Sequence, residues 1–162
     1  MTDIVGEAKV KVLLAVKGNE PEAYFARVAK VSTVGTAGEV VVAHVVDITP
    51  RGGLETGRER FLGRRRLAEQ RSGDVAQAEE ERARGVLQFA HQSLVVAGVP
   101  DDRIREVVLR GKPNEELRRM ADSEGTDLIV VQGRSEKPGP HSLGKTARFL
   151  IDHAPRAALL VR

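Results

Sequence analysis

Five short stretches of the chain are almost continuously apolar and rich in β-branched residues. They are residues 9–16, 39–47, 105–110, 127–132 and 157–161. Continuous apolar runs of this length are typical of strands covered on both faces, whereas a strand with one face in water alternates apolar and polar residues. The pattern therefore predicts five strands of a parallel sheet that is buried between two layers.

Amphipathic helical patterns fill the gaps between these stretches. Apolar residues recur at intervals of three and four in residues 21–32, 74–97 and 142–153, and another helix opens with the proline at position 113. Strand and helix alternate four times before the last strand, which predicts one three-layer, doubly wound α/β domain over residues 1–162. The inner faces are expected to carry Val75, Ala78, Ala83, Val86, Leu87, Ala90 and Leu94 in the longest helix, and Leu143, Ala147, Leu150, Ile151 and Ala154 in the last.

The segment at about residues 48–73 contains five glycines among its arginines and is predicted to be a long connection, with a short helix near residues 60–69. Residues 51–71 hold seven Arg and three Glu, so this segment is positive while the rest of the chain is nearly neutral. We interpret it as a solvated arm; contact with the phosphates of a nucleic acid or an anionic membrane is the weaker alternative. Because the chain has no Trp and only 3% aromatic residues, we do not expect nucleic acid as a partner.

The composition excludes several kinds of chemistry. The chain has no cysteine, which rules out disulfides, zinc–thiolate sites, iron–sulfur clusters and a cysteine nucleophile. It has neither a serine-nucleophile motif nor a histidine pair with metal-ligand spacing, so we expect no catalytic or metal site, and at most slow nucleotide hydrolysis. His44 is expected to be an ordinary strand residue. No apolar run approaches the roughly 20 residues of a membrane span and the first residues are unlike a signal peptide, which predicts a cytoplasmic protein.

Three segments directly follow predicted strands: residues 16–19, 45–47 and 133–146. Ligands of open α/β sheets bind beyond the carboxyl ends of the strands. The last segment is basic and glycine-rich, and it leads into a helix N-terminus, which favours an anion. Its polar side chains include Arg134, Ser135, Lys137, His141, Ser142, Lys145 and Thr146. Two interpretations stay open: a phosphate site, or a solvated loop in which Ser142 is the helix N-cap.

Six segments, taken together, carry a resemblance to a known family. They are Lys11-Val-Leu-Leu-Ala-Val16, Val42-Ala-His-Val-Val-Asp47, Gly111-Lys-Pro-Asn-Glu-Glu116, Asp127-Leu-Ile-Val-Val-Gln-Gly133, Leu143-Gly-Lys-Thr-Ala-Arg-Phe-Leu-Ile-Asp-His-Ala-Pro155 and the strand at residues 157–161. Through them the chain resembles the universal stress protein family over nearly its whole length. The resemblance implies a Rossmann-like fold of the adenine nucleotide alpha hydrolase type, with a five-stranded parallel sheet in the order 3-2-1-4-5, and usually a homodimer.

In nucleotide-binding members of the family, ATP lies across the ends of the first and fourth strands. The resemblance therefore implies ATP or another adenine nucleotide as a cofactor of this chain, with a need for Mg²⁺ left open. The base is expected near Ala15 and Val45. The other expected contacts are Lys17, Gly133, Arg134, Ser135, Ser142, Gly144, Lys145 and Thr146.

The chain departs from the family's ATP motif, in which Gly, two residues, Gly, nine residues and Gly precede Ser or Thr. Glu136 stands at the second glycine, Lys145 replaces the hydroxyl residue, and Gly144 follows Gly133 by eleven positions instead of thirteen. Lys17 also replaces the acid that meets the adenosine. A glutamate close to a triphosphate is repulsive. Two hypotheses therefore remain open: binding of an adenine nucleotide or another phosphate-bearing ligand, and a nucleotide-free dimeric adaptor that acts through protein contacts.

The C-terminal strand predicts an interface. A strand at a sheet edge exposes unpaired N–H and C=O groups that invite aggregation, and antiparallel pairing with a second copy removes both edges. We therefore predict a homodimer through this strand; the alternative is an edge blunted by Arg156 and Arg162. The residues of the predicted interface are Ala157, Ala158, Leu159, Leu160 and Val161.

Overall fold

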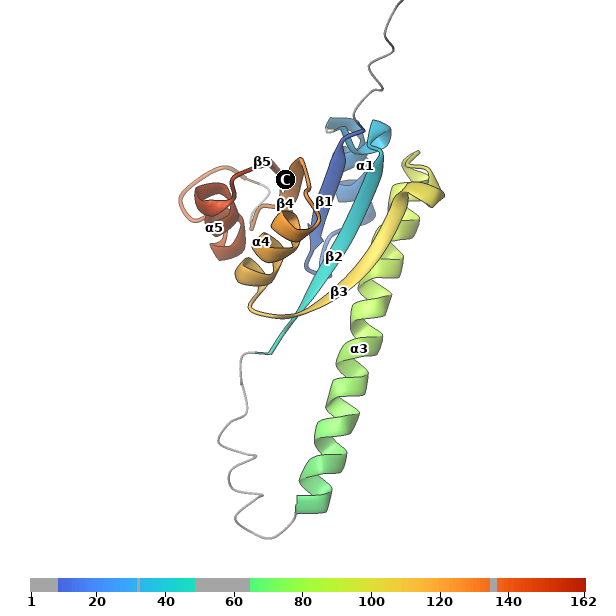
Figure 1. Cartoon of the computed structure of the whole chain (residues 1–162), viewed down its shortest axis with the longest axis vertical. Helices are drawn as coiled ribbons and strands as arrows, with labels where there is room; N and C mark the ends of the chain where they lie inside the picture. The colour runs from blue at the N-terminus through green and yellow to red at the C-terminus, as the bar shows by residue number, and fades with distance from the viewer. Residues whose placement is uncertain (1–8, 32, 49–64, 135–136) are drawn as a thin grey trace, which may run out of the picture.

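The computed structural model describes residues 9–31, 33–48, 65–134 and 137–162 (Figure 1). Its strands are β1 (Lys11–Val16), β2 (Glu39–Asp47), β3 (Ile104–Gly111), β4 (Leu128–Gln132) and β5 (Ala157–Val161). The helices are α1 (Glu22–Val31), α3 (Arg65–Val96), α4 (Pro113–Ser123) and α5 (Lys145–His153), with 3₁₀ turns η1 (Thr33–Thr36) and η2 (Asp101–Arg103).

The five strands form one parallel sheet in the order β3-β2-β1-β4-β5, which confirms the predicted fold class and strand order. Strand β1 lies in the middle, and Leu13 of β1 stands opposite Val41 of β2 on one side and Ile129 of β4 on the other. The chain first moves outward from β1 to β2 and β3, then returns to the other side of β1 to form β4 and β5. The order of the strands therefore reverses between β1 and β4.

Alternating residues of the strands enter two separate cores. On one face, Leu14 packs in a cluster with Phe25 of α1 and Leu87 of α3. On the other face, Leu13 packs with Leu117 of α4 and Leu150 of α5. Each of these side chains is almost fully buried, and burial of one such side chain stabilises the folded state by about 1.5–3 kcal/mol. Because both faces of the sheet are covered, the inner strands β1, β2 and β4 are buried over most of their length, as their sequence pattern predicted. The prediction does not hold for the edge strands, since β3 exposes Arg105, Glu106 and Arg110, and β5 begins with two exposed alanines.

Helix α3 corrects two predictions about the middle of the chain. It begins at Arg65, so residues 65–73 are part of one long helix and not of a connection with its own short helix. Gly73 does not interrupt this helix, because a single glycine costs only about 1 kcal/mol among good helix formers. The remainder of the predicted connection, residues 49–64, lies outside the described residues.

The first half of α3 (green in Figure 1) runs past the ends of the strands. Val75 is 57% exposed and Ala78 is also exposed, so the prediction that they belong to the inner face was wrong. From Ala83 to Leu94 the predicted face is confirmed, because here the helix lies against β2 and β3. Ile151 of α5 was likewise predicted to be buried and is 44% exposed.

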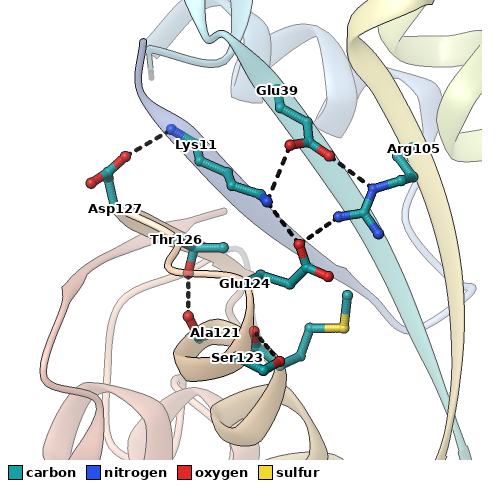
Figure 2. A network of polar contacts seen from close by, with 9 residues as sticks. Lys11, Glu39, Arg105, Ala121, Ser123, Glu124, Thr126 and Asp127 are labelled. Carbon is teal, nitrogen blue, oxygen red and sulfur yellow. Dashed lines mark hydrogen bonds and ion pairs between the residues drawn. The ribbon is translucent and has the colours of Figure 1, made fainter. Parts of the chain in front are cut away.

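A network of four charged side chains joins the amino ends of the strands (Figure 2). The Lys11 ammonium lies 3.2 Å from a Glu39 carboxylate oxygen and 2.7 Å from Glu124 at the end of α4. Arg105 of β3 lies between the same two carboxylates, with Nε at 2.8 Å from Glu39 and a terminal nitrogen at 2.6 Å from Glu124. The backbone N–H of Lys11 also donates to the Asp127 carboxylate at 2.9 Å. The network therefore ties β1, β2, β3 and α4 together at this end of the sheet.

The charges of the network shift one another's titration. Hydrogen bonds from Lys11 and Arg105 hold the pKa of the Glu124 carboxyl below its usual range, and hydrogen bonds from Arg105 and Lys11 do the same for the pKa of Glu39. A carboxyl group whose pKa is lower in the folded chain stabilises the fold above its unfolded pKa of about 4.5, and this stabilisation is lost as the pH falls.

We predict that Glu124→Gln lowers the free energy of unfolding at pH 7 by about 1 kcal/mol at most, because the ion pairs are partly exposed to solvent. The difference from the unsubstituted protein should shrink as the pH falls below about 4.5. Denaturant unfolding at pH 7 and at acidic pH measures both effects. Glu115→Gln is the matched control, since Glu115 makes one exposed ion pair with Lys112 and should change stability little at either pH. An equal loss at both pH values would contradict the assigned role of the carboxylate.

Candidate functional site

A cavity of about 260 Å³ lies at the carboxyl ends of the central strands, where the strand order reverses. We call it the switch-point cavity. Its lining comes from β1, β2, β4, α4 and α5, and most of it is apolar. The residues that line it are Ala15, Val16, Lys17, Ala43, His44, Val45, Pro113, Leu117, Val131, Gln132, Thr146 and Ala147.

The turn that follows β1 holds Lys17 at the mouth of this cavity. The backbone N–H groups of Lys17 and Gly18 donate to the two oxygens of the Glu20 carboxylate, at 2.5 and 2.8 Å. Glu20 is only 5% exposed, so its charge is satisfied by the turn that it closes. The Lys17 ammonium lies 3.5 Å from the Gln132 carbonyl oxygen, so the side chain extends from the end of β1 toward the end of β4.

Gly18 allows this turn to pass close to helix α3. Its φ is +105°, in the region that favours glycine, and a Cβ built there would lie 2.8 Å from Cγ2 of Val86. No other residue type fits both the backbone conformation and the space. The position of Lys17 therefore depends on the packing of α3 as well as on the sheet.

His44 is a cavity residue that sequence reasoning expected only as part of a strand. The register places it opposite Val16, and its Nδ1 lies 2.9 Å from the Val16 carbonyl oxygen. Since a carbonyl oxygen only accepts, Nδ1 carries the hydrogen and the Nε2 position is left for another partner. The pairing thus fixes the orientation of the imidazole at the end of β2.

Three backbone N–H groups of the predicted phosphate loop donate to carbonyl oxygens of the protein. The N–H of Gly133 donates to the Val161 carbonyl at 3.1 Å, and the N–H of Arg134 donates to the Ser142 carbonyl at 2.7 Å. The Ser142 hydroxyl lies 3.3 Å from the guanidinium of Arg162. The backbone N–H of Ser142 donates to the Gly139 carbonyl oxygen. The amides of Gly133 and Arg134 therefore point to protein acceptors and not to a ligand.

Helix α5 does not begin where the sequence suggested. Its N-cap is Gly144, with φ +78° and no side-chain capping hydrogen bond, so Ser142 is not the N-cap. A Cβ at Gly144 would lie 3.3 Å from Cβ of Arg134, which makes glycine the residue that fits this approach. The first N–H groups of α5 lack intrahelical acceptors, as at every helix start, and Thr146 and Ala147 of this first turn line the cavity.

The structure brings together only part of the residues predicted for the site. Ala15, Lys17, Val45 and Thr146 line the same cavity. Arg134 and Ser142 line a separate, open hollow of about 540 Å³ together with Lys137 and His141. Lys145 is exposed at the start of α5, Gly133 and Gly144 are placed as described above, and Ser135 and Glu136 lie outside the described residues.

The sequence analysis did not predict that residues of α4 line the switch-point cavity. Pro113 and Leu117 line the cavity because α4 starts directly after β3, at the same end of the sheet as the end of β1. The signal was present in the proline that opens α4, since a helix that follows a strand begins at the carboxyl edge of a parallel sheet.

Among the residues that the structure describes, no three His, Asp or Glu side chains are grouped in a way that suits a metal ion. No helix in the described ranges has the length and apolar character needed to cross a bilayer.

Comparisons with known proteins agree with this architecture. The sequence model described as Universal stress protein family matches residues 10–162. A relative from Thermus aquaticus, named a universal stress protein in the QAH/OAS sulfhydrylase 3′ region, is 28% identical over 152 residues, which are 93% of this chain and 97% of the relative.

Solved structures show the same fold at low sequence identity. A universal stress protein in complex with cAMP has a TM-score of 0.62 at 16% identity and covers 95% of this chain and 97% of its own. A universal stress protein family member from Arabidopsis thaliana with AMP bound has a TM-score of 0.60 at 16% identity, over 94% of this chain and 90% of its own.

We predict that Gly18→Ala lowers the free energy of unfolding by about 2 kcal/mol, because alanine is strained at a positive φ and its methyl group meets Val86. Gly73→Ala should instead raise it by about 0.5–1 kcal/mol, since this glycine is helical and a Cβ there meets nothing within 4 Å. Denaturant unfolding of the two variants measures the contrast. A Gly18→Ala protein as stable as the unsubstituted chain would show that the turn is not held as described.

Proposed function

The chain belongs to the universal stress protein family, and on this basis we propose that it binds an adenine nucleotide in the switch-point cavity. The observation that carries the proposal is that Ala15, Lys17, Val45 and Thr146, from two strand ends and a helix start, line one cavity at the reversal of strand order. Open α/β sheets bind their ligands at this position. Two proteins of the same fold are described with cAMP and with AMP bound.

The lining of the cavity suits the base of such a ligand. The sheet and helix α4 both supply apolar surface, through Ala15, Val45 and Val131 of the strands and Leu117 of the helix. A flat heteroaromatic ring that binds among these side chains is removed from water, which favours binding. Polar groups lie at the mouth of the cavity, with the Lys17 ammonium among them. An apolar interior with a cation at its edge favours a base that is joined to an anionic group.

The size of the cavity favours a nucleoside monophosphate over ATP. Its volume of about 260 Å³ lies just below the roughly 300–1,000 Å³ of pockets for drug-sized ligands. The loop that carries the family's ATP motif has the amides of Gly133 and Arg134 already paired. We therefore propose AMP or cyclic AMP as the ligand type, with Lys17 nearest to its anionic part, and we propose no catalytic role.

The second candidate is a nucleotide-free adaptor that acts through protein contacts. The observation that favours it is that the amides of Gly133 and Arg134 and the Lys17 ammonium already have partners within the protein.

Both candidate functions are compatible with the same proposed homodimer. Strand β5 is at an edge of the sheet, Ala157 and Ala158 are exposed, and Leu159 and Leu160 are only partly buried. Antiparallel pairing of β5 with a second copy would satisfy this edge.

We predict saturable binding of AMP and cyclic AMP to the full chain in calorimetric titrations, and weaker binding of ATP. Val45→Trp should abolish this binding, because a large side chain at the half-buried Val45 position fills the cavity. Val96→Trp is the matched control, since Val96 is 75% exposed on α3, and it should leave the affinity unchanged. The absence of heat with all three nucleotides would remove the nucleotide proposal and leave the adaptor.

We predict that the chain is a dimer in light scattering coupled to size exclusion, and that Ala158→Lys makes it a monomer. The substitution places two like charges near the proposed two-fold axis, where they repel each other. Ala23→Lys makes the same change at an exposed position of α1 and should leave the dimer intact. A dimer that persists in Ala158→Lys would show that β5 is not the interface.

A further inference from the structure

A second, smaller hollow of about 150 Å³ adjoins the switch-point cavity. The two share Lys17, His44 and Val45, which stand at the ends of β1 and β2. We call the second one the polar hollow, because Asp47 of β2 and two charged residues of α3 form much of its remaining lining. An extended ligand in the apolar cavity therefore reaches the polar hollow by passing over the strand ends.

The charged residues from α3 are Glu79 and Arg82. They are present at this position because α3 continues beyond the sheet and borders the strand ends (Figure 1). Arg82 makes no hydrogen bond or ion pair with another residue that the structure describes. By contrast Arg84, two positions along the same helix, lies 3.8 Å from the Glu80 carboxylate. The guanidinium of Arg82 is thus available to an anion, and guanidinium groups bind phosphate oxygens in pairs.

We propose that the phosphate of the bound nucleotide lies in the polar hollow, between Lys17 and Arg82, and not on the loop at residues 133–144. This inference rests on the proposed function, because it takes the base to occupy the switch-point cavity. It makes Arg82 of α3 a specificity-determining residue for a phosphate-bearing ligand.

The charged residues that line the polar hollow favour a monophosphate over a triphosphate. Two cations, Lys17 and Arg82, stand with two carboxylates, Asp47 and Glu79. These four charges sum to zero, so a monophosphate, which carries about −1.5 to −2 at pH 7, binds there through direct contacts with Lys17 and Arg82. A triphosphate adds further negative charge that would face the carboxylates at short range. A carboxylate beside the phosphate also offers an acceptor for a ribose hydroxyl.

Titrations of the full chain with AMP and with adenosine separate the phosphate contact from the base contact. Arg82→Ala should weaken AMP binding about tenfold and leave adenosine binding unchanged, because adenosine lacks the phosphate. Arg84→Ala removes the same charge from the same helix and should leave both affinities unchanged. Glu79→Gln should strengthen AMP binding severalfold by removing a repulsive carboxylate. Circular dichroism confirms that the variants keep the helix.

The outcomes are distinguishable. If Arg82→Ala binds AMP as tightly as the unsubstituted chain, or if Arg134→Ala weakens AMP binding more than Arg82→Ala does, the phosphate lies elsewhere and the inference is wrong. If adenosine and AMP both bind but Arg82→Ala weakens them equally, Arg82 supports the structure and is not a phosphate contact. If neither ligand binds to the unsubstituted chain, the proposed function fails and the inference fails with it.

Discussion

The parallel pairing of β1 with β2 on one side and β4 on the other is the constraint on which the site depends. Val12, Leu13 and Leu14 of β1 are fully buried, so this strand has to be covered on both faces and paired along both edges. The chain satisfies that demand by winding outward in both directions from β1. The two connections leave in opposite directions, so the carboxyl end of β1 stays uncovered, and the switch-point cavity lies there.

The two ends of the sheet have different tasks. At the amino end, Lys11, Glu39, Arg105 and Glu124 close the sheet with mutually satisfied charges (Figure 2). At the carboxyl end, the charged side chains of Lys17, Asp47, Glu79 and Arg82 line a hollow. The charge network and the candidate binding site therefore lie at opposite ends of the strands.

The turn after β1 places a cation at the open end of this strand. Glu20 and Gly18 fix its backbone, and Lys17 supplies a cation at the position where the family resemblance implied an acid. A carboxylate accepts hydrogen bonds from the hydroxyl groups of a sugar, whereas an ammonium group attracts a phosphate. In the proposed binding mode, the phosphate is therefore recognised near β1 and α3, while the amides of Gly133 and Arg134 are used within the protein.

The sequence by itself determined the strands, because a continuous apolar run needs cover on both faces wherever it lies, and the family resemblance supplied their order. It also placed Ala15, Lys17 and Val45 at strand ends. Only the tertiary structure decided that Val75 and Ala78 are exposed, since a helical face is buried only where another layer lies against it. It also decided that Pro113, Leu117 and His44 line the cavity, and that the Gly133 amide bonds to Val161. These contacts join residues that are distant in the chain, and a local pattern of polar and apolar residues does not predict which distant groups come into contact.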